Sequence, residues 1–390
     1  MKSSIKAWIF VWLLVMPFNG VMAQGKGKKE EPAKPEVKES WTDKFESGYD
    51  KGFYIKTKNE KFKLNITSYA QFMYEFHKFD DPADDDTNTF RVRRARLVFA
   101  GNIFTKKLGY KFQLDLTKPT LLDAFYEYKA FGDALVIRIG QYTIPMNRQQ
   151  LTSSSKQQFN DRSLASSEFI PGVEIDSNKD GTVEKTVKDG RDIGLMVHGK
   201  VLKKKLDYQV AAMNAAGMNT TNVNNEFLYA ARASYNILGD YGYSESDIER
   251  SDDPSVFVGG HGIYNVAEVT QNKILQGGFE SGMKWKGLSL QGEFMVRDTN
   301  KMTAADKRDY GYYAQAGYFL IPKKFEVAAR ASQIFFEGPR NDKAEFSLGL
   351  NYFIFKQNVK LQSDYSWLPD NTATGVENNH RVRLKLQTAF

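Results

Sequence analysis

The stretch Phe62–Lys78, which reads FKLNITSYAQFMYEFHK, decides the fold. Apolar side chains recur at every second position of it and polar ones fill most positions between: Phe62, Leu64, Ile66, Ala70, Phe72, Tyr74 and Phe76 alternate with Lys63, Asn65, Thr67, Gln71, Glu75 and His77. A period of two over this length is typical of a β-strand and does not fit a helix. Its length exceeds the ~9–11 residues that a tilted strand needs to cross a bilayer. The stretch therefore predicts a long strand with one face toward lipid and the other toward water.

The same alternation recurs along the rest of the chain. It is found at Ala95–Phe99, Tyr110–Leu116, Ala124–Tyr128, Leu135–Ile139, Ile193–Val197, Leu206–Ala212, Phe227–Ile237, Val256–Tyr264, Leu275–Trp285, Leu288–Val296, Tyr310–Leu320, Phe325–Gln333, Phe346–Tyr352, Val359–Trp367 and His380–Phe390. The total is roughly sixteen strands, an even number, as single-chain bacterial barrels require. The pattern predicts an all-β fold, a transmembrane antiparallel β-barrel.

Connection lengths give a second pattern. Outer-membrane barrels have short periplasmic turns and long outer loops. Short connections fall at one end, namely Thr105–Lys107, Phe131–Asp133, Lys286–Gly287, Pro322–Lys324 and Lys356–Gln357. Long ones fall at the other end, namely Lys78–Thr89, Gln141–Asp189, Met213–Asn225, Asp298–Arg308 and Leu368–Asn378. Leu238–Pro254 is long where a short turn is expected, which leaves open a miscounted strand nearby.

The beginning of the chain reads as an export signal. Lys2 and Lys6 precede the apolar run Ala7–Phe18, and small or apolar residues before Gln24 predict cleavage after residue 23. Residues 24–50 are rich in Lys, Glu and Pro, so they predict a flexible charged periplasmic segment. Residues 51–390 are then the barrel. The expected location is the outer membrane of a Gram-negative bacterium.

Composition agrees with this location. The chain has no Cys, which argues against a disulfide scaffold, and its 20 Tyr and 28 Phe suit the aromatic girdles of a membrane barrel. The formal net charge is +7, and loss of Lys2 and Lys6 with the signal would leave +5. Basic residues alternate with acidic ones and no helical motif carries them, so the sequence does not indicate nucleic-acid binding.

Several motifs resemble the phosphate-selective porin O and P family. They occur in the family's order and are Phe90–Leu97 (FRVRRARL) with Gly101, Tyr110–Leu116 (YKFQLDL), Asp123–Tyr128 (DAFYEY), Arg138–Pro145 (RIGQYTIP), Leu151–Ser154, Asp161–Ser163 and Arg191–Gly194 (RDIG). The resemblance covers most of residues 50–390. It implies a sixteen-stranded diffusion channel, a homotrimer, with a long third loop folded into the lumen. Gln141–Asp189 would be that loop.

One departure from the family pattern lies in this loop. In the family a Pro-Gly pair runs directly into Arg-Asp-Ile-Gly, whereas here Val173–Gly190 separates Pro171-Gly172 from Arg191. The solute selected at a constriction here can therefore differ from the family's phosphate.

The alternation also predicts which charges line the lumen. Seven cations are expected there: Lys63, Arg94, Arg96, Arg138, Arg381, Arg383 and Lys385. Such a basic wall would concentrate anions and speed their entry. Five acids, Asp115, Asp123, Glu127, Glu293 and Glu326, are candidates for a facing negative wall. The alternative is that cations and acids pair locally and only keep the lumen solvated.

A candidate metal loop occurs within Gln141–Asp189. Oxygen ligands at Asp176, Asn178 and Asp180, then Gly181 and Thr182, follow the order of a calcium loop. The twelfth position is Val187, so the bidentate carboxylate is missing unless Glu184 or Asp189 replaces it. A polar turn in an exposed loop is the other interpretation. No other cofactor is expected.

Three functions follow from these observations. The first is a porin that passes small hydrophilic solutes with a tilt toward anions, phosphate among them. The second is a plugged structural or adhesive barrel that binds a partner through its outer loops. The third, an enzyme, is disfavoured, because the four His residues lie in no catalytic motif. Outer-membrane lipid and lipopolysaccharide are expected partners. The acidic run Asp80–Asp86 is interpreted first as a solvated outer loop, with bridging of divalent cations to lipopolysaccharide as the alternative.

Overall fold

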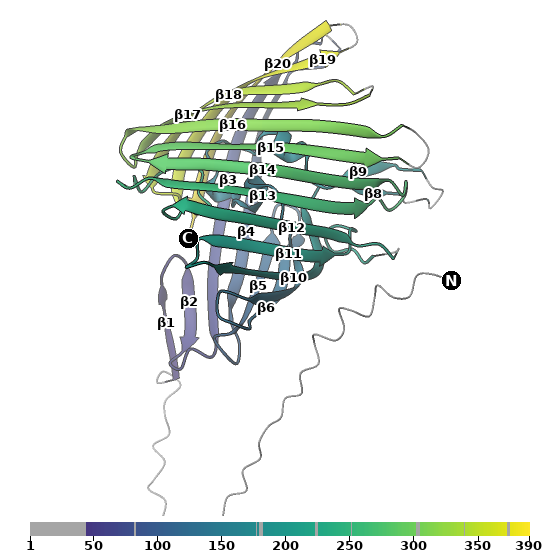
Figure 1. The fold of residues 1–390 in the computed structure, drawn as a ribbon. Coiled ribbons are helices and arrows are strands. Elements are labelled where there is room, and N and C mark those ends of the chain that lie inside the picture. Colours follow the sequence, from purple (N-terminus) through teal and green to yellow (C-terminus); the bar gives the residue numbers. More distant parts are fainter. Residues whose placement is uncertain are drawn as a thin grey trace, which may run out of the picture. The chain divides into compact units, whose positions relative to one another are not determined.

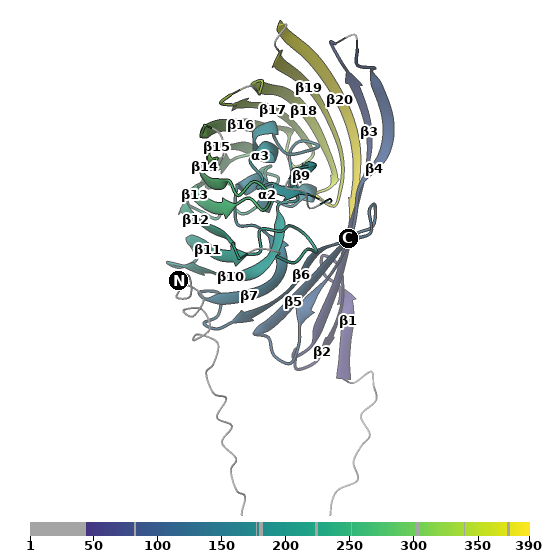
Figure 2. The same ribbon diagram turned by 90° about the vertical axis from the view of Figure 1, so that its right-hand side faces the viewer.

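The barrel is closed by pairing of its last strand with its first. A computed structural model describes residues 44–390 except 82, 177, 179–181, 223–224, 251, 302–304, 339 and 373–374. Its main sheet has 18 strands, of which β1 and β2 stand outside the ring. Each strand of the ring pairs antiparallel with the next, and β20 pairs with β3 (Figures 1 and 2). The prediction of a sixteen-stranded antiparallel barrel is confirmed.

The sixteen strands of the ring differ in length. They are β3 (Lys63–Lys78), β4 (Thr87–Asn102), β5 (Leu108–Asp115), β6 (Thr120–Lys129), β7 (Val136–Thr143), β10 (Arg191–Val201), β11 (Leu206–Met213), β12 (Leu228–Leu238), β13 (Ser255–Val266), β14 (Lys273–Trp285), β15 (Leu288–Asn300), β16 (Lys307–Ile321), β17 (Phe325–Phe335), β18 (Lys343–Phe355), β19 (Val359–Thr372) and β20 (Gly375–Ala389). No helix in the described part of the chain is long and apolar enough to cross a membrane.

The two faces of the wall differ as the alternation predicts. In β18, Leu348 and Leu350 are 65% and 50% exposed, whereas Ser347 and Asn351 on either side of them are buried. In β3, Phe72 is half exposed and Gln71 is fully buried. Apolar side chains therefore point outward along these strands, and polar side chains point inward, which is the reverse of a soluble protein and typical of a membrane barrel.

A β-bulge in β4 interrupts this alternation once near the middle of the wall. Gln71 of β3 pairs with Arg94, and the next residue, Phe72, pairs with Val92, so Arg93 has no residue opposite it. A bulge inserts one residue and re-aims the side chains beside it. Arg93 and Arg94, which strict alternation would send to opposite faces, therefore both reach the same partner inside the barrel.

The turn at Lys286-Gly287 shows why the short connections are short. Both residues have positive φ, 49° and 91°, as a two-residue hairpin turn with the right twist requires.

The predicted long connection Leu368–Asn378 is wrong. There β19 and β20 continue as a paired hairpin up to Thr372 and Gly375, because their backbones go on pairing with each other beyond the last pair that β19 makes with β18.

A hairpin precedes the ring, where a flexible segment was expected. Residues 24–43 lie outside the described residues, but β1 (Phe45–Tyr49) pairs with β2 (Phe53–Thr57), and β2 pairs with the start of β3. The prediction of flexibility through residue 50 is therefore wrong at its end. Tyr49 packs edge-on against Phe53, and Phe53 packs against Phe390, so aromatic contacts order this hairpin.

The long connection between β7 and β10, residues 144–190, carries its own short elements. They are α2 (Arg148–Leu151), the 3-10 helix Ser154–Lys156, α3 (Leu164–Glu168) and the hairpin of β8 (Val173–Ile175) and β9 (Lys185–Val187), which the insertion forms. Connection 144–190 hydrogen-bonds to inward-facing side chains of β3 and of every strand from β15 to β20.

The apolar core of the molecule lies on the inward side of the wall. Ile144, Met146 and Ile170 of connection 144–190 pack with inward residues of β6, β7 and β10–β13, among them Phe125 and Met213. A second cluster joins Ala165 and Phe169 to Met295 and Ile334. These contacts fix connection 144–190 against the strands that surround it.

Connection 239–254 leaves the barrel from the end that carries the short turns, and it is a true long connection rather than a miscounted strand. Its side chains are buried: Tyr241, Glu245, Ser246, Asp247 and Ile248 are at most 7% exposed. Side chains this deeply buried must contact other parts of the protein. Those of connection 239–254 contact both the barrel wall and connection 144–190.

Candidate functional site

The carboxylate of Asp161, in connection 144–190, gathers arginines from two strands. It lies 2.9 Å from Arg93 and from Arg94 of β4, and 3.3 Å from Arg383 of β20. Burial alone would raise the pKa of the Asp161 carboxyl, but Arg94, Arg93 and Arg383 outweigh it and hold the pKa well below its ordinary 3.8. Asp161 is therefore ionised at neutral pH and cancels part of this positive charge.

The three predicted cations of β20 all point inward and all have partners. Arg383 is buried and binds Asp364 at 2.7 Å in addition to Asp161. Lys385, also buried, donates to the carbonyl oxygen of Asn160 at 3.1 Å. Arg381 is partly exposed and lies 3.7 Å from Glu345. The inward cations of β20 therefore form a network of ion pairs and hydrogen bonds, and Arg381 is the one of the three that stays partly exposed.

The other predicted cations are spread over three strands. Arg96 of β4 lies 3.4 Å from Asp115 and belongs with Arg94 on the strand next to β3. Arg138 of β7 binds Glu127 at 2.8 Å and stacks on the ring of Phe125. Lys63, the first residue of β3, lies beside β2 with its ammonium 5.7 Å from the ring of Tyr54. The structure thus brings five of the seven together on β4 and β20, and leaves Lys63 and Arg138 apart.

The expected negative wall does not form as a separate face. Asp115 and Glu127 pair with the cations of neighbouring strands, and Asp123 holds both Lys111 at 2.6 Å and Arg191 at 2.8 Å. The two remaining acids accept hydrogen bonds from connection 144–190, Glu293 from the backbone of Gln149 and Glu326 from the side chain of Gln158. Local pairing, the alternative weighed from the sequence, is what the geometry shows.

Two hollows meet at the arginine cluster. The first, of about 760 Å³, is lined by nine cationic side chains and two carboxylates: Lys51, Arg93, Arg94, Arg96, Lys111, Lys156, Arg162, Lys188 and Arg191, with Asp123 and Asp189. The second, of about 470 Å³, is lined by Lys343, Arg381 and Arg383 with Asp161, Glu345 and Asp370. Arg93, Arg94 and Arg162 line both, so the arginines separate two positively lined spaces.

Several cations of these hollows were not predicted. Lys111 lies between the outward-facing Tyr110 and Phe112, so the alternation held the signal that would have found it. Arg93 is inward only because of the bulge, and no sequence pattern marks a bulge there. Arg162 and Lys156 lie in connection 144–190, where side-chain direction follows from tertiary contacts and not from a period.

The candidate calcium loop lies partly outside the described residues. Asp180 belongs to that part, whereas Asp176, Asn178 and Thr182 are described between β8 and β9. Among the described residues no group of three or more His, Asp or Glu side chains is placed to hold a metal ion.

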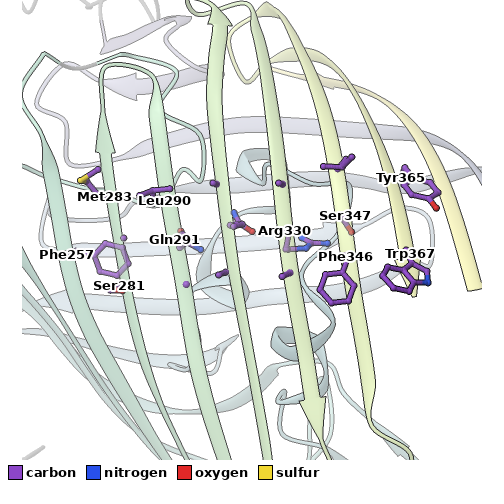
Figure 3. Close-up of a pocket in the computed structure, with 18 of the residues that line it drawn as sticks. Phe257, Ser281, Met283, Leu290, Gln291, Arg330, Phe346, Ser347, Tyr365 and Trp367 are labelled. Atoms are coloured by element: carbon purple, nitrogen blue, oxygen red, sulfur yellow. The ribbon is translucent and has the colours of Figure 1, made fainter. Parts of the chain in front are cut away.

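A hollow on the outward face has a different character. It measures about 980 Å³ and spans the outer surface from β13 to β20 (Figure 3). Small outward residues at one level of neighbouring strands, Ser281, Gly292, Ala314 and Ala331, form its floor, and Leu290, Phe346 and Trp367 stand around it. This apolar trough belongs to the lipid face of the wall, not to the charged site.

Comparison with known proteins agrees with this geometry. The phosphate-selective porin O and P family model matches residues 66–246 and 264–390. A solved anion-selective porin from Comamonas acidovorans aligns over 84% of this chain and 99% of its own, with 13% identity and a TM-score of 0.59. Salmonella typhi OmpF, in a complex with daunomycin, aligns over 85% and 99% with 12% identity and a TM-score of 0.55.

A curated relative, an uncharacterized protein of Aquifex aeolicus, is 26% identical over 329 residues, which are 70% of this chain and 73% of the relative. The fold is thus that of outer-membrane porins. Because the family model covers well over half of its length, the chain belongs to the phosphate-selective porin O and P family, and it is an outer-membrane channel.

Proposed function

We propose that this protein is a diffusion channel for small hydrophilic solutes with a preference for anions, and that it is not an enzyme. The observation that carries the proposal is the hollow of about 760 Å³ with nine cations against two carboxylates. A water-filled space with this charge and low-dielectric walls favours entry of anions over cations. The anion-selective porin of Comamonas acidovorans shares the fold and supports the same assignment.

The path runs between connection 144–190 and the wall of β3–β6 and β20. Connection 144–190 narrows the lumen by covering the inward faces of β15–β20, and its own Arg162 and Lys156 face the space that remains. An anion would pass from the hollow at Arg381 to the hollow at Arg191 through the arginines common to both. Arg93 and Arg94 are held by Asp161, and Arg162 donates to the backbone carbonyl oxygens of Gln149 and Gln150, so these arginines are fixed in position rather than extended into the path.

Oxyanions such as phosphate are one class of solute that this lining suits. Guanidinium groups bind phosphate oxygens through paired N–H donors, and hydroxyl groups of Ser153 and Ser155 face the same hollow. Phosphate should then compete with chloride and lower the chloride current at millimolar concentration. A chloride current that ignores phosphate would leave a general anion channel and remove the phosphate preference.

Planar bilayer recording of the protein purified from the outer membrane tests the proposal. We expect stepwise ohmic openings and a reversal potential of anion-selective sign under a salt gradient. Openings with no selectivity would keep the channel and reject the anion preference. A folded barrel without conductance would reject the channel and favour the rival, a plugged barrel that binds a partner through its outer loops. The observation that favours the plugged barrel is that connections 144–190 and 239–254 bury many of the inward side chains.

We also propose a homotrimer and contacts with lipopolysaccharide. A hollow of about 1020 Å³ on the outward face combines three cations and three acids with the rings of Tyr264 and Tyr310: Lys273, Lys307 and Arg308, with Asp298, Asp306 and Glu337. Arg308 is paired with Asp298, so Lys273 and Lys307 are the cations proposed to meet a phosphorylated glycolipid there. Native mass spectrometry from mild detergent should report three chains with bound glycolipid.

A calcium ion between β8 and β9 stays a prediction, and a calcium titration followed by calorimetry checks it.

A further inference from the structure

Connection 239–254 meets connection 144–190, although the two come from opposite ends of the barrel. Connection 239–254 joins β12 to β13 at the short-turn end, and connection 144–190 joins β7 to β10 at the other end. The family model leaves residues 247–263 unmatched, so part of connection 239–254 lies outside the family pattern. The residues that make the contact, Tyr241–Ser246, lie at the end of the matched part, directly before the unmatched residues.

Glu245 makes the contact between the two. Its carboxylate accepts hydrogen bonds from the side chain of Gln149 at 3.1 Å and from the backbone N–H of Gln158 at 2.8 Å. Its own backbone N–H donates to the carbonyl oxygen of Lys156 at 3.1 Å. Glu245 is 1% exposed, so these bonds replace its hydration completely. A buried carboxylate in this position holds its partners strongly, because removing it leaves several donors unpaired.

Arg148 of α2 makes the reciprocal contact. Its guanidinium stacks on Tyr241 at 4.8 Å and Tyr243 at 4.6 Å, and donates to the carbonyl oxygen of Gly242. It also lies 3.9 Å from the ring of Phe257 on β13. Each connection thus inserts one charged side chain into the other.

One residue of the wall binds both connections at once. Glu326 of β17 accepts hydrogen bonds from Gln158 at 2.7 Å and from Ser246 at 2.8 Å. Ser289 of β15 accepts a further bond from Gln158 at 3.0 Å. The contact between the two connections is therefore tied to the side of the barrel opposite the basic hollow.

We infer that connection 239–254 is a clasp that holds connection 144–190 against β15–β19 and so keeps the water path on the basic side. Glu245 is the positioning residue, and it acts through Gln149 and Gln158 rather than by touching the solute. The inference rests on the proposed channel function. Without the clasp, connection 144–190 would be free to leave the wall, the path would widen, and the charges of Arg162 and Lys156 would lose their place beside it.

Because the chain has no Cys, a single introduced cysteine reports local access to water without background. Ser289→Cys lies under the clasped connection and is 2% exposed, whereas Ser153→Cys lies in the basic hollow and is exposed. In bilayers, a charged thiosulfonate reagent should change the current of Ser153→Cys at once and leave that of Ser289→Cys unchanged. Adding Glu245→Ala should make Ser289→Cys react more than ~10-fold faster, raise the conductance and weaken anion selectivity. Glu245→Gln keeps one of the two acceptor oxygens but turns an amide N–H toward the other donor, so it should give values between those of Glu245→Ala and the wild type.

The outcomes separate the two proposals. If the unmodified protein does not conduct, the channel function fails, and the clasp that rests on it fails with it. If it conducts but Ser289→Cys reacts as fast as Ser153→Cys, the path is not confined and the clasp is wrong. If Glu245→Ala changes neither the reaction rate nor the selectivity, Glu245 has no positioning role. Heat-modifiable migration on a gel confirms that each variant is a folded barrel.

Discussion

At the scale of single residues, Asp161 sets how much positive charge the channel presents. It is the shared partner of Arg93, Arg94 and Arg383 and is itself about one-fifth exposed. Asp161→Asn should increase anion selectivity, because one negative charge leaves the path. It should also destabilise the barrel by roughly 1–3 kcal/mol, since buried arginines lose their acceptor. The reversal potential and the urea midpoint measure the two effects. Asp133→Asn, which breaks only the exposed pairs with Lys129 and Lys204, should change neither.

The pKa of Asp161 gives a pH prediction with a definite sign. A carboxyl whose folded pKa lies below its unfolded value stabilises the folded state above the unfolded pKa, and this stabilisation is lost as the pH falls through the folded pKa. The pKa of Asp161 lies well below 3.8. The stability difference between the native protein and Asp161→Asn should therefore stay constant from pH 7 to about 5 and shrink only below about pH 4. A difference that disappears between pH 7 and 5 would show that Asp161 is not held by these arginines.

Residue-level prediction worked where one strand's alternation decided the direction of a side chain. Arg94, Arg383 and Lys385 were assigned to the inward face from sequence, and they lie there. Their partners Asp161 and Asn160 could not be predicted, because both lie in connection 144–190, whose contacts span more than 200 residues of sequence. Alternation predicts the face of a strand, and only tertiary packing determines what meets it.

At the scale of secondary-structure elements, the bulge in β4 has the clearest consequence. It turns Arg93 inward beside Arg94, although an unbroken strand would point Arg93 to lipid. Arg93→Cys should therefore react with a water-soluble charged thiol reagent and change the current. Val92→Cys, its exposed neighbour on the outward face, should react only with a membrane-permeant reagent. If neither cysteine reacted with the water-soluble reagent, the inward position of Arg93 at the bulge would be contradicted.

Some elements of the structure could not be predicted from the sequence, for identifiable reasons. The strand β1 was missed because the charged composition before it masks the aromatic pair Phe45 and Tyr49. The connection 239–254 was recognised as too long, but its role depends on Glu245 reaching Gln149, which no local pattern encodes. The period and length of the sequence pattern predict that a strand or a long connection exists. They do not predict which other segment it contacts.

At the scale of the whole molecule, the outward face must be compatible with lipid all around the ring. Ala314 lies on the floor of the apolar trough, level with Gly292 and Ala331 on the adjacent strands. Ala314→Arg should destabilise the barrel in lipid vesicles by about 2–4 kcal/mol if this level is near the bilayer centre. Ala314→Leu is the matched control and should be nearly neutral. Equal urea midpoints for the two variants would place this face outside the membrane.

In this channel, anions are proposed to pass along the inward cations of β4 and β20. The most direct test is the reversal potential, under a potassium chloride gradient, of a variant in which Arg94, Arg96, Arg381 and Arg383 are all replaced by Gln. Arg308→Gln, which removes a charge from the outward face, is the control. We expect the fourfold variant still to form open channels and its selectivity to shift toward cations, while the control keeps the native reversal potential. An unchanged reversal potential in a conducting fourfold variant would contradict the claim.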